Sequence, residues 1–191
     1  MKKQVIIFSM FFTVLIASCS FASDFDSYKT LHEARVLSIT DGDTISIRFI
    51  ETPQGCSRIE KVRLIGIDTP ELFTKPSEYF AQEAKDFTTE MLLNKDIYIE
   101  FDNTGLRDYY GRLLAYVRLS NTKEIQKDFE KYVDIKPITS ALNNNTFLYN
   151  EAIILAGYSY YYGKYTFDEK YMKQFASAEE MAELLKLGLW K

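Results

Sequence analysis

Residues 61–71 of the chain read KVRLIGIDTPE. The first seven residues are mostly apolar and predict a β-strand, and Pro70 ends it because proline has no backbone N–H to offer a neighbouring strand. Within this strand Arg63 needs an anionic partner, since an unpaired guanidinium is costly to bury. The stretch therefore predicts a strand that carries one arginine and leads directly into two acids, Asp68 and Glu71.

Further strands are predicted on both sides of this stretch. Apolar and polar residues alternate from Ala34 onward, and the turn Asp41-Gly42-Asp43 divides this region into two strands. Two later strands are predicted at 97–101 and 113–119. The alternating apolar positions before residue 50 are Leu37, Ile39, Ile45, Ile47 and Phe49.

Three helices are predicted between and after these strands. Ser77 is a suitable N-cap for a helix that runs to about residue 91. A short helix is predicted at 148–156. The last helix is expected to open with the capping box Ser177-x-x-Glu180 and to close at Gly188.

This order of elements predicts one α+β domain at 34–191. The expected architecture is a five-stranded β-barrel of the oligonucleotide-binding type (OB-fold) with three helices. The segment at about 120–147 is interpreted as a surface insertion. With 191 residues, 47% of them hydrophobic, the chain can bury the core of such a domain.

The first residues predict a signal peptide. Two lysines precede an apolar run that is shorter than the roughly 20 residues a membrane-spanning helix needs. Two cleavage sites remain open: before Cys19, as in bacterial lipoproteins, or after Ala22, as in secreted proteins. The preferred interpretation is a lipoprotein signal peptide at 1–18 and a polar tether at 19–33. It predicts an extracytoplasmic protein anchored to a membrane through lipid on Cys19.

Composition narrows the possible chemistry. Two cysteines and one histidine are too few for a structural zinc site or a two-histidine metal site. No Gly-rich phosphate loop or Gly-x-Ser-x-Gly motif occurs, so carboxylates, arginines, tyrosines or a hard metal ion must carry any reaction. Removal of residues 1–18 takes away Lys2 and Lys3 and no acid, which changes the net charge from −4 to −6. A polyanionic substrate must therefore be held locally, because non-specific affinity for nucleic acid comes from many basic residues.

Two of the acids can form a cation site. Asp43 follows a tight turn and Asp68 ends a neighbouring strand, so their carboxylates can converge at one edge of the barrel. Two acids with a backbone carbonyl, without imidazole or thiolate, favour calcium, magnesium or manganese. The alternative is that Asp41 and Asp43 only shape a hairpin turn, which is the usual role of an Asp-Gly pair.

Two arginines indicate an anionic ligand. Arg63 lies in an apolar strand, and Arg112 follows a glycine turn at the start of another. Planar guanidinium groups bind phosphate oxygens in pairs and can stabilise the extra charge of a five-coordinate phosphorus. The alternative for each arginine is an internal salt bridge, for instance Arg63 with Glu71 or Arg112 with Asp108.

Together these motifs resemble those of the staphylococcal nuclease (thermonuclease) family, with a bacterial lipoprotein-type leader. The resemblance covers about residues 34–190 apart from the insertion, and the motifs have the family's order and spacing. The matching segments are Asp41-Gly42-Asp43-Thr44, residues 62–71, Asp108-Tyr109-Tyr110-Gly111-Arg112, Leu114-Ala115-Tyr116 and Asn150-Glu151-Ala152.

The resemblance implies a calcium-dependent endonuclease. Such an enzyme hydrolyses phosphodiester bonds of DNA and RNA by in-line attack of water and leaves 3′-phosphate ends. It implies one Ca²⁺ per chain, held by Asp43, Asp68 and the carbonyl of Thr69, with Asp41 close behind them.

The resemblance also assigns the catalytic and substrate-contacting positions. Arg63 and Arg112 match the catalytic arginines, and Glu71 matches the carboxylate that orients or deprotonates the attacking water. Tyr110 matches a substrate-contacting tyrosine, and either Tyr162 or Tyr165 matches another.

The alternative function is a barrel that binds nucleic acid or protein without cleaving it. Degenerate relatives usually lose the acids or the arginines, and here they are all present, which favours the enzyme. The expected partners are DNA and RNA as substrates and a membrane through Cys19. No protein partner is implied, and we expect a monomer.

Overall fold

The structure is a computed structural model that describes residues 30–133 and 146–191. The predicted signal peptide, Cys19 and the tether up to residue 29 lie outside the described residues, as does the part of the insertion at 134–145. Within the described ranges, no helix is both long enough and apolar enough to cross a membrane.

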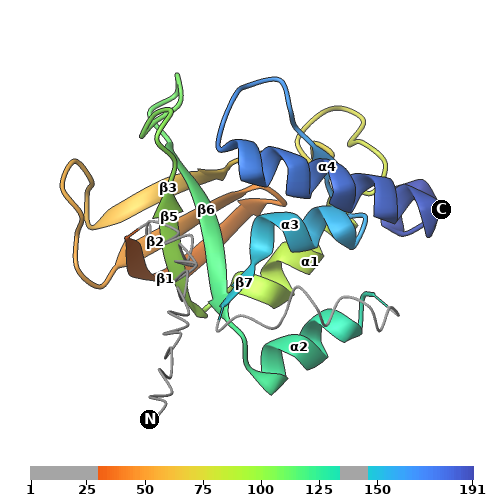
Figure 1. The fold of residues 1–191 in the computed structure, drawn as a ribbon, viewed down its shortest axis with the longest axis horizontal. Coiled ribbons are helices and arrows are strands. Elements are labelled where there is room, and N and C mark those ends of the chain that lie inside the picture. The colour runs from red at the N-terminus through yellow and green to blue at the C-terminus, as the bar shows by residue number, and fades with distance from the viewer. Residues whose placement is uncertain (1–29, 134–145) are drawn as a thin grey trace, which may run out of the picture.

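Five strands form a closed barrel, as predicted (Figure 1). Neighbours pair antiparallel in the order β3-β2-β1-β5-β6, and a parallel pairing of β3 with β6 closes the barrel. The helices gather on one side of the barrel. The barrel strands are β1 (Leu31–Asp41), β2 (Thr44–Phe49), β3 (Ile59–Leu64), β5 (Asp96–Phe101) and β6 (Leu113–Ser120).

Shorter strands and the helices complete the described fold. The α+β class with an OB-type barrel is confirmed, and the described helix count exceeds the predicted three by one α-helix. The short strands are β4 (Ile67–Asp68), β7 (Thr146–Leu148) and β8 (Tyr160–Tyr161). The helices are α1 (Ala81–Leu92), α2 (Lys123–Glu130), α3 (Tyr149–Leu155), α4 (Glu169–Leu184) and the 3₁₀-helix η2 (Gly188–Trp190).

The start of β1 has a different phase from the predicted alternation. Ala34 and Val36 are fully buried, whereas Leu37 and Ile39 are only half-buried. The pairing of β1 with β2 shifts between Val36 and Ser38, as at a β-bulge, and this shift changes which side chains face the core. The strand itself begins at Leu31, three residues before the expected start of the barrel.

Two helix starts were predicted wrongly. α1 begins after Phe80 and not at Ser77, because the backbone of Glu78 bonds back to Glu71 and closes the intervening segment as a loop (N···O 3.1 Å). α4 begins at Glu169, where the Asp168 side chain accepts a hydrogen bond from the Lys170 amide at 3.0 Å. The predicted capping box at residue 177 lies inside this helix, which ends at Leu184, before Gly188.

The described part of the insertion is not merely a surface excursion. The Thr122 side chain caps α2, and the helix packs against α1. Ile125 and Phe129 are buried, and the Phe129 ring meets the Phe87 ring edge-on with centroids 6.2 Å apart. This segment therefore extends the hydrophobic core beside α1.

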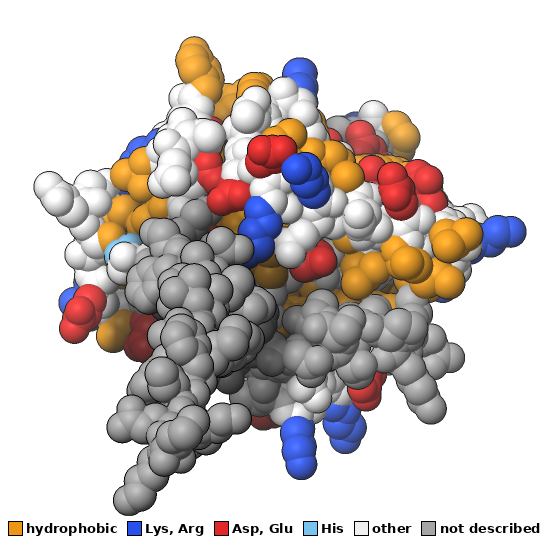
Figure 2. Space-filling model, viewed as in Figure 1, with side chains coloured by type: hydrophobic (Ala, Val, Ile, Leu, Met, Phe, Trp, Pro, Cys, Tyr) orange, Lys and Arg blue, Asp and Glu red, His pale blue; other side chains and the backbone are white. Residues whose placement is uncertain are grey.

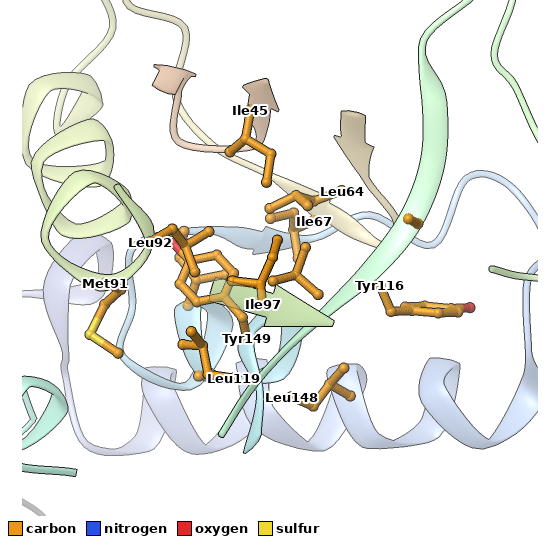
Figure 3. Close-up of a cluster of buried hydrophobic side chains, with 14 of the residues drawn as sticks. Ile45, Leu64, Ile67, Met91, Leu92, Ile97, Tyr116, Leu119, Leu148 and Tyr149 are labelled. Carbon is orange, nitrogen blue, oxygen red and sulfur yellow. The ribbon is translucent and has the colours of Figure 1, made fainter. Parts of the chain in front are cut away.

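The core holds the strands that carry the candidate site (Figure 3). Ile45, Leu64 and Ile67 are essentially inaccessible, and each follows or precedes a polar residue of the site. Burial of each such side chain contributes about 1.5–3 kcal/mol relative to exposure. Because side chains alternate along a strand, burying these three fixes the direction in which Thr44 and Arg63 point.

Charged side chains are dispersed on the face shown in Figure 2. Lysines and arginines lie among acidic and apolar side chains there and do not form a continuous basic surface. This distribution agrees with the acidic net charge of the chain.

Candidate functional site

The turn between β1 and β2 is held from two sides. A Cβ atom added to Gly42 would lie 2.6 Å from Cγ2 of Thr69, so only glycine fits this close approach. On the other side, the Thr88 hydroxyl donates a hydrogen bond to the Gly42 carbonyl at 2.8 Å. Asp43, next in sequence, is 4% exposed, and its Oδ1 accepts the Thr44 hydroxyl at 2.8 Å.

A sharp bend after β3 brings Asp68 to this turn. Gly66 has φ +75°, and a Cβ there would lie 2.7 Å from the rings of Phe167 and Phe175. After the bend, the Asp68 amide donates a hydrogen bond to the Ser159 hydroxyl at 2.9 Å, next to the short β4–β8 ladder. The bend therefore places Asp68 next to Arg63 in space.

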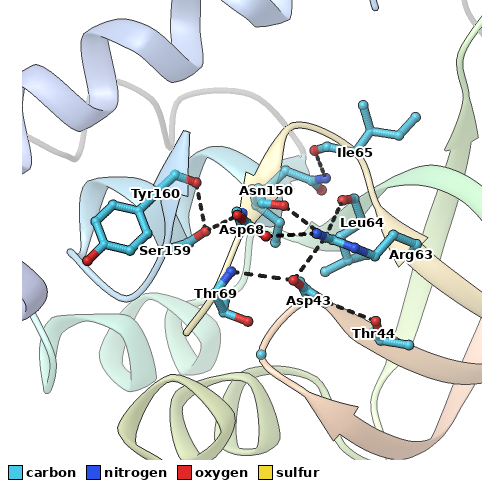
Figure 4. Close-up of polar contacts among 12 residues, drawn as sticks. Asp43, Thr44, Arg63, Leu64, Ile65, Asp68, Thr69, Asn150, Ser159 and Tyr160 are labelled. Carbon is cyan, nitrogen blue, oxygen red and sulfur yellow. Dashed lines mark hydrogen bonds and ion pairs between the residues drawn. The ribbon is translucent and has the colours of Figure 1, made fainter. Parts of the chain in front are cut away.

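Arg63 bridges the two carboxylates (Figure 4). Its guanidinium lies 3.0 Å from Asp43 Oδ2 and 3.2 Å from Asp68 Oδ1. It also donates to the carbonyls of Leu64 and Ile67, at 3.1 and 2.8 Å. The anionic partners of Arg63 are therefore Asp43 and Asp68, and the alternative pairing with Glu71 was wrong.

Arg112, at the end of the β5–β6 loop, approaches the Asp43 carboxylate. Its Nε lies 2.6 Å from Asp108 Oδ2, so the Arg112–Asp108 salt bridge is confirmed. The guanidinium also lies 5.5 Å from the ring centroid of Tyr110, and it is 3.4 Å from the Thr44 hydroxyl that donates to Asp43. Thr44 thus connects Arg112 with the carboxylate that Arg63 contacts directly.

Both arginines line one open pocket of about 570 Å³. Six of the predicted site residues line it: Arg63, Asp68, Asp108, Tyr110, Arg112 and Tyr162. Tyr165 lines it as well, with its ring 5.8 Å from that of Tyr162, so both candidates for the late substrate-contacting tyrosine are present.

The other predicted residues lie outside the pocket lining. Asp43 and Thr69 are buried, and Asp41 is half-buried. Glu71 is exposed on the loop after β4, and its amide donates to Glu78 Oε2 at 2.9 Å. Partial loss of hydration raises the pKa of the Glu71 carboxyl group, and the negative charges of Asp41 and Asp68 add to the rise. Glu71 therefore lies in the electrostatic field of the same acids.

The acids fit a hard cation in their chemistry. Burial raises the pKa of Asp43 to about 7 although Arg63 opposes the rise, and the charge of Asp41 raises it further. Burial also raises the pKa of Asp68, again against Arg63. Asp41 Oδ1 is buried without a hydrogen-bond partner among the described residues. The raised pKa values and the unpaired oxygen indicate that nearby positive charge does not fully balance these carboxylates. A divalent cation would supply the missing charge.

The number of side-chain ligands is small. In the described ranges, no three or more His, Cys, Asp or Glu side chains are arranged to hold a metal ion. A cation would therefore depend on the pair Asp43 and Asp68 together with a main-chain oxygen, for which Thr69 is the predicted source.

Comparison with known proteins identifies the family. The model of the family described as staphylococcal nuclease homologue matches residues 61–191. The chain belongs to the staphylococcal nuclease family. The matched region contains Arg63, Asp68, Glu71 and Arg112, whereas Asp43 lies before it, in the turn between β1 and β2.

Several individual proteins are similar to this chain over most of its length. The thermonuclease of Staphylococcus hyicus is 29% identical, covering 82% of this chain and 74% of the relative. The SPbeta prophage-derived endonuclease of Bacillus subtilis is 30% identical over 85% of this chain but only 45% of its own length. An uncharacterized protein of Methanocaldococcus jannaschii is 27% identical over the whole chain and 95% of its own length.

Several residues that shape this nuclease-family site were not predicted. Ser159 accepts the Asp68 amide, Thr88 bonds to the Gly42 carbonyl, and Asn150 links Ile65 to the barrel. Ser159 and Thr88 carry only hydroxyls and lie far from the acids in sequence, so no local pattern marks them. Asn150 was recognised as part of a motif, but its role was not.

Proposed function

We propose that this protein is a calcium-dependent endonuclease that hydrolyses phosphodiester bonds in DNA and RNA and leaves 3′-phosphate ends. The observation that carries the proposal is the convergence of Arg63 and Arg112 on one pocket beside two carboxylates. Membership of the staphylococcal nuclease family supports the same conclusion, since the named relatives include a thermonuclease and an endonuclease.

The two arginines would bind the phosphodiester and stabilise the transition state. In-line attack of water forms a bond to phosphorus and breaks the bond to the 5′ oxygen, which leaves as a hydroxyl after taking a proton. Negative charge increases on the equatorial oxygens during this step. Guanidinium groups fixed in advance by Asp43, Asp68 and Asp108 can meet that charge without reorganising, which typically contributes about 10²- to 10³-fold per donor.

Asp43, Asp68 and the carbonyl of Thr69 would hold the calcium ion, with Asp41 next to them. When bound, the ion supplies positive charge that polarises the phosphoryl group and the attacking water. Glu71 would orient this water or accept its proton. Its raised pKa brings it closer to neutral pH, which suits an acceptor of this kind.

Tyrosines at the pocket would hold the sugar or base. Tyr110 is 79% exposed beside Arg112, and Tyr162 lines the same pocket. An aromatic face stacks on any base, so it provides affinity without sequence preference. Such contacts suit an acidic protein, in which a broad basic surface does not hold the substrate.

Cleavage assays with plasmid DNA and with RNA test this proposal. We expect both to be cut in calcium and neither in excess chelator, and the fragments should carry 3′-phosphate and 5′-hydroxyl ends. Binding of either nucleic acid without cleavage in calcium would contradict the proposal and favour a non-catalytic barrel.

We also propose that the protein is an extracytoplasmic lipoprotein anchored through Cys19. The proposal depends on the sequence alone, because the leader lies outside the described residues. We expect the wild type to partition into detergent with the membrane fraction, and Cys19→Ala to become soluble or to remain as uncleaved precursor. Equal release of both proteins into the medium, with Ser23 at the N-terminus, would instead indicate secretion after cleavage following Ala22.

A further inference from the structure

Two buried hydroxyl groups connect the helices to the turn that carries the acids. Tyr149 on α3 donates to Thr88 Oγ1 on α1 at 2.8 Å, and Thr88 Oγ1 donates to the Gly42 carbonyl at 2.8 Å. Tyr149 and Thr88 are both fully buried. Neither residue lines the pocket, so neither is available to contact a substrate there.

The Tyr149 hydroxyl limits the hydrogen bonds that the Thr88 hydroxyl can make. A threonine hydroxyl has one proton to donate, and in a helix it commonly goes to the carbonyl four residues earlier, here Ala84 at 3.0 Å. By filling an acceptor position on Thr88 Oγ1, Tyr149 leaves the Thr88 proton to be shared between Ala84 and the closer Gly42 carbonyl. Burial raises the pKa of Tyr149, so its hydroxyl remains a donor at neutral pH.

The Gly42 peptide is consequently fixed between two threonines. Thr69 fills the space on one side so tightly that no Cβ is tolerated, and Thr88 binds the carbonyl on the other. Asp41 and Asp43 flank this peptide, so its orientation sets where their carboxylates lie. A bond that only stabilised α1 would not need to reach this turn.

We propose that Thr88 and Tyr149 are positioning residues for the cation site, which they tune by orienting the Gly42 peptide between Asp41 and Asp43. This inference rests on the proposed function in one respect, namely that the cation is held by Asp43. Removal of groups that orient metal ligands typically weakens metal binding by about 10- to 100-fold.

Calcium titration of the full chain without nucleic acid tests the inference. Isothermal titration calorimetry would compare the wild type with Thr88→Val, Thr88→Ser and Tyr149→Phe. The matched control is Thr89→Val, because the Thr89 hydroxyl bonds only to Lys85 of its own helix, at 2.8 Å, among the hydrogen bonds of the described residues. Melting temperatures in chelator would report the stability of each variant separately.

We expect Thr88→Val to weaken calcium binding about tenfold or more, and Tyr149→Phe to weaken it measurably but less than Thr88→Val does. Thr88→Ser should restore affinity to within about twofold, because it keeps the hydroxyl, and Thr89→Val should bind as the wild type does. If Thr88→Val does not fold, Tyr149→Phe carries the test.

Three results would overturn the inference, and they can be told apart. If Thr88→Val binds calcium as tightly as the wild type does, the positioning role is wrong and the proposed nuclease is unaffected; Tyr149→Phe takes its place if Thr88→Val does not fold. Equal weakening of calcium binding in Thr89→Val would lead to the same conclusion. A wild-type chain that binds no calcium would contradict the cation site itself, and with it the calcium dependence of the proposed function.

Discussion

Asn150→Ala should destabilise the protein strongly, because Asn150 satisfies two buried backbone groups. Its Oδ1 accepts the Val117 amide at 2.9 Å, and its Nδ2 donates to the Ile65 carbonyl at 2.9 Å, while the side chain is fully buried. An unsatisfied buried backbone group costs about 1–3 kcal/mol. Alanine leaves two such groups, so the free energy of unfolding should fall by about 2–6 kcal/mol.

Urea denaturation without calcium would measure this loss. The exposed Asn103 is the matched control, and Asn103→Ala should change the free energy of unfolding by no more than about 0.5 kcal/mol. A loss below about 1 kcal/mol for Asn150→Ala would refute the reasoning, since it would show that neither backbone group depends on this amide. Because Ile65 lies in the bend between Arg63 and Asp68, activity should fall together with stability.

Three further predictions concern the pocket and the buried acid beside it. Arg112→Lys should lower the cleavage rate by about 10²- to 10³-fold with little change in melting temperature, since lysine cannot bind Asp108 and a phosphate as a planar fork. A large loss of stability with turnover intact would instead indicate a purely structural ion pair. Calcium binds the ionised carboxylate, and burial raises the pKa of Asp43 to about 7, so its calcium affinity should fall by up to about tenfold per pH unit below pH 7 when measured by calorimetry. A calcium affinity independent of pH between 6 and 8 would contradict this. Tyr110→Ala should raise KM for single-stranded DNA by about 5- to 150-fold and leave kcat nearly unchanged, because stacking contributes about 1–3 kcal/mol per base. A loss confined to kcat would argue against stacking.

The barrel could be predicted because its signals are local. Alternation and turn residues located the five strands, and Gly66 and Pro70 mark the two ends of the segment that bends toward the site. The phase of β1 could not be predicted, since a bulge near Val36 depends on how β1 pairs with β2. The start of α1 was wrong for a similar reason, because the bond between Glu78 and Glu71 forms only in the folded loop.

The site could be predicted in its charged residues but not in its supporting hydroxyls. Arg63 was noticeable because a guanidinium in an apolar strand needs an anion, yet sequence alone did not show that this anion is the pair Asp43 and Asp68. Thr88 and Ser159 are ordinary hydroxyl residues whose partners lie 46 and 91 positions away. Only the closure of the barrel against its helices brings them to the acids.

The cleavage rate of Asp43→Asn in calcium is the most direct measurement of whether the pocket and the acids beside it form a calcium-dependent nuclease site. The substitution removes the charge of a buried carboxylate while keeping its shape, and Asp96→Asn, at an exposed ion pair with Arg35, is the matched control. We predict that Asp43→Asn cuts DNA at least about 10²-fold more slowly at limiting calcium while unfolding at a temperature close to that of the wild type, and that Asp96→Asn cuts normally. Undiminished cleavage by Asp43→Asn at limiting calcium would contradict the assignment of the cation to this carboxylate.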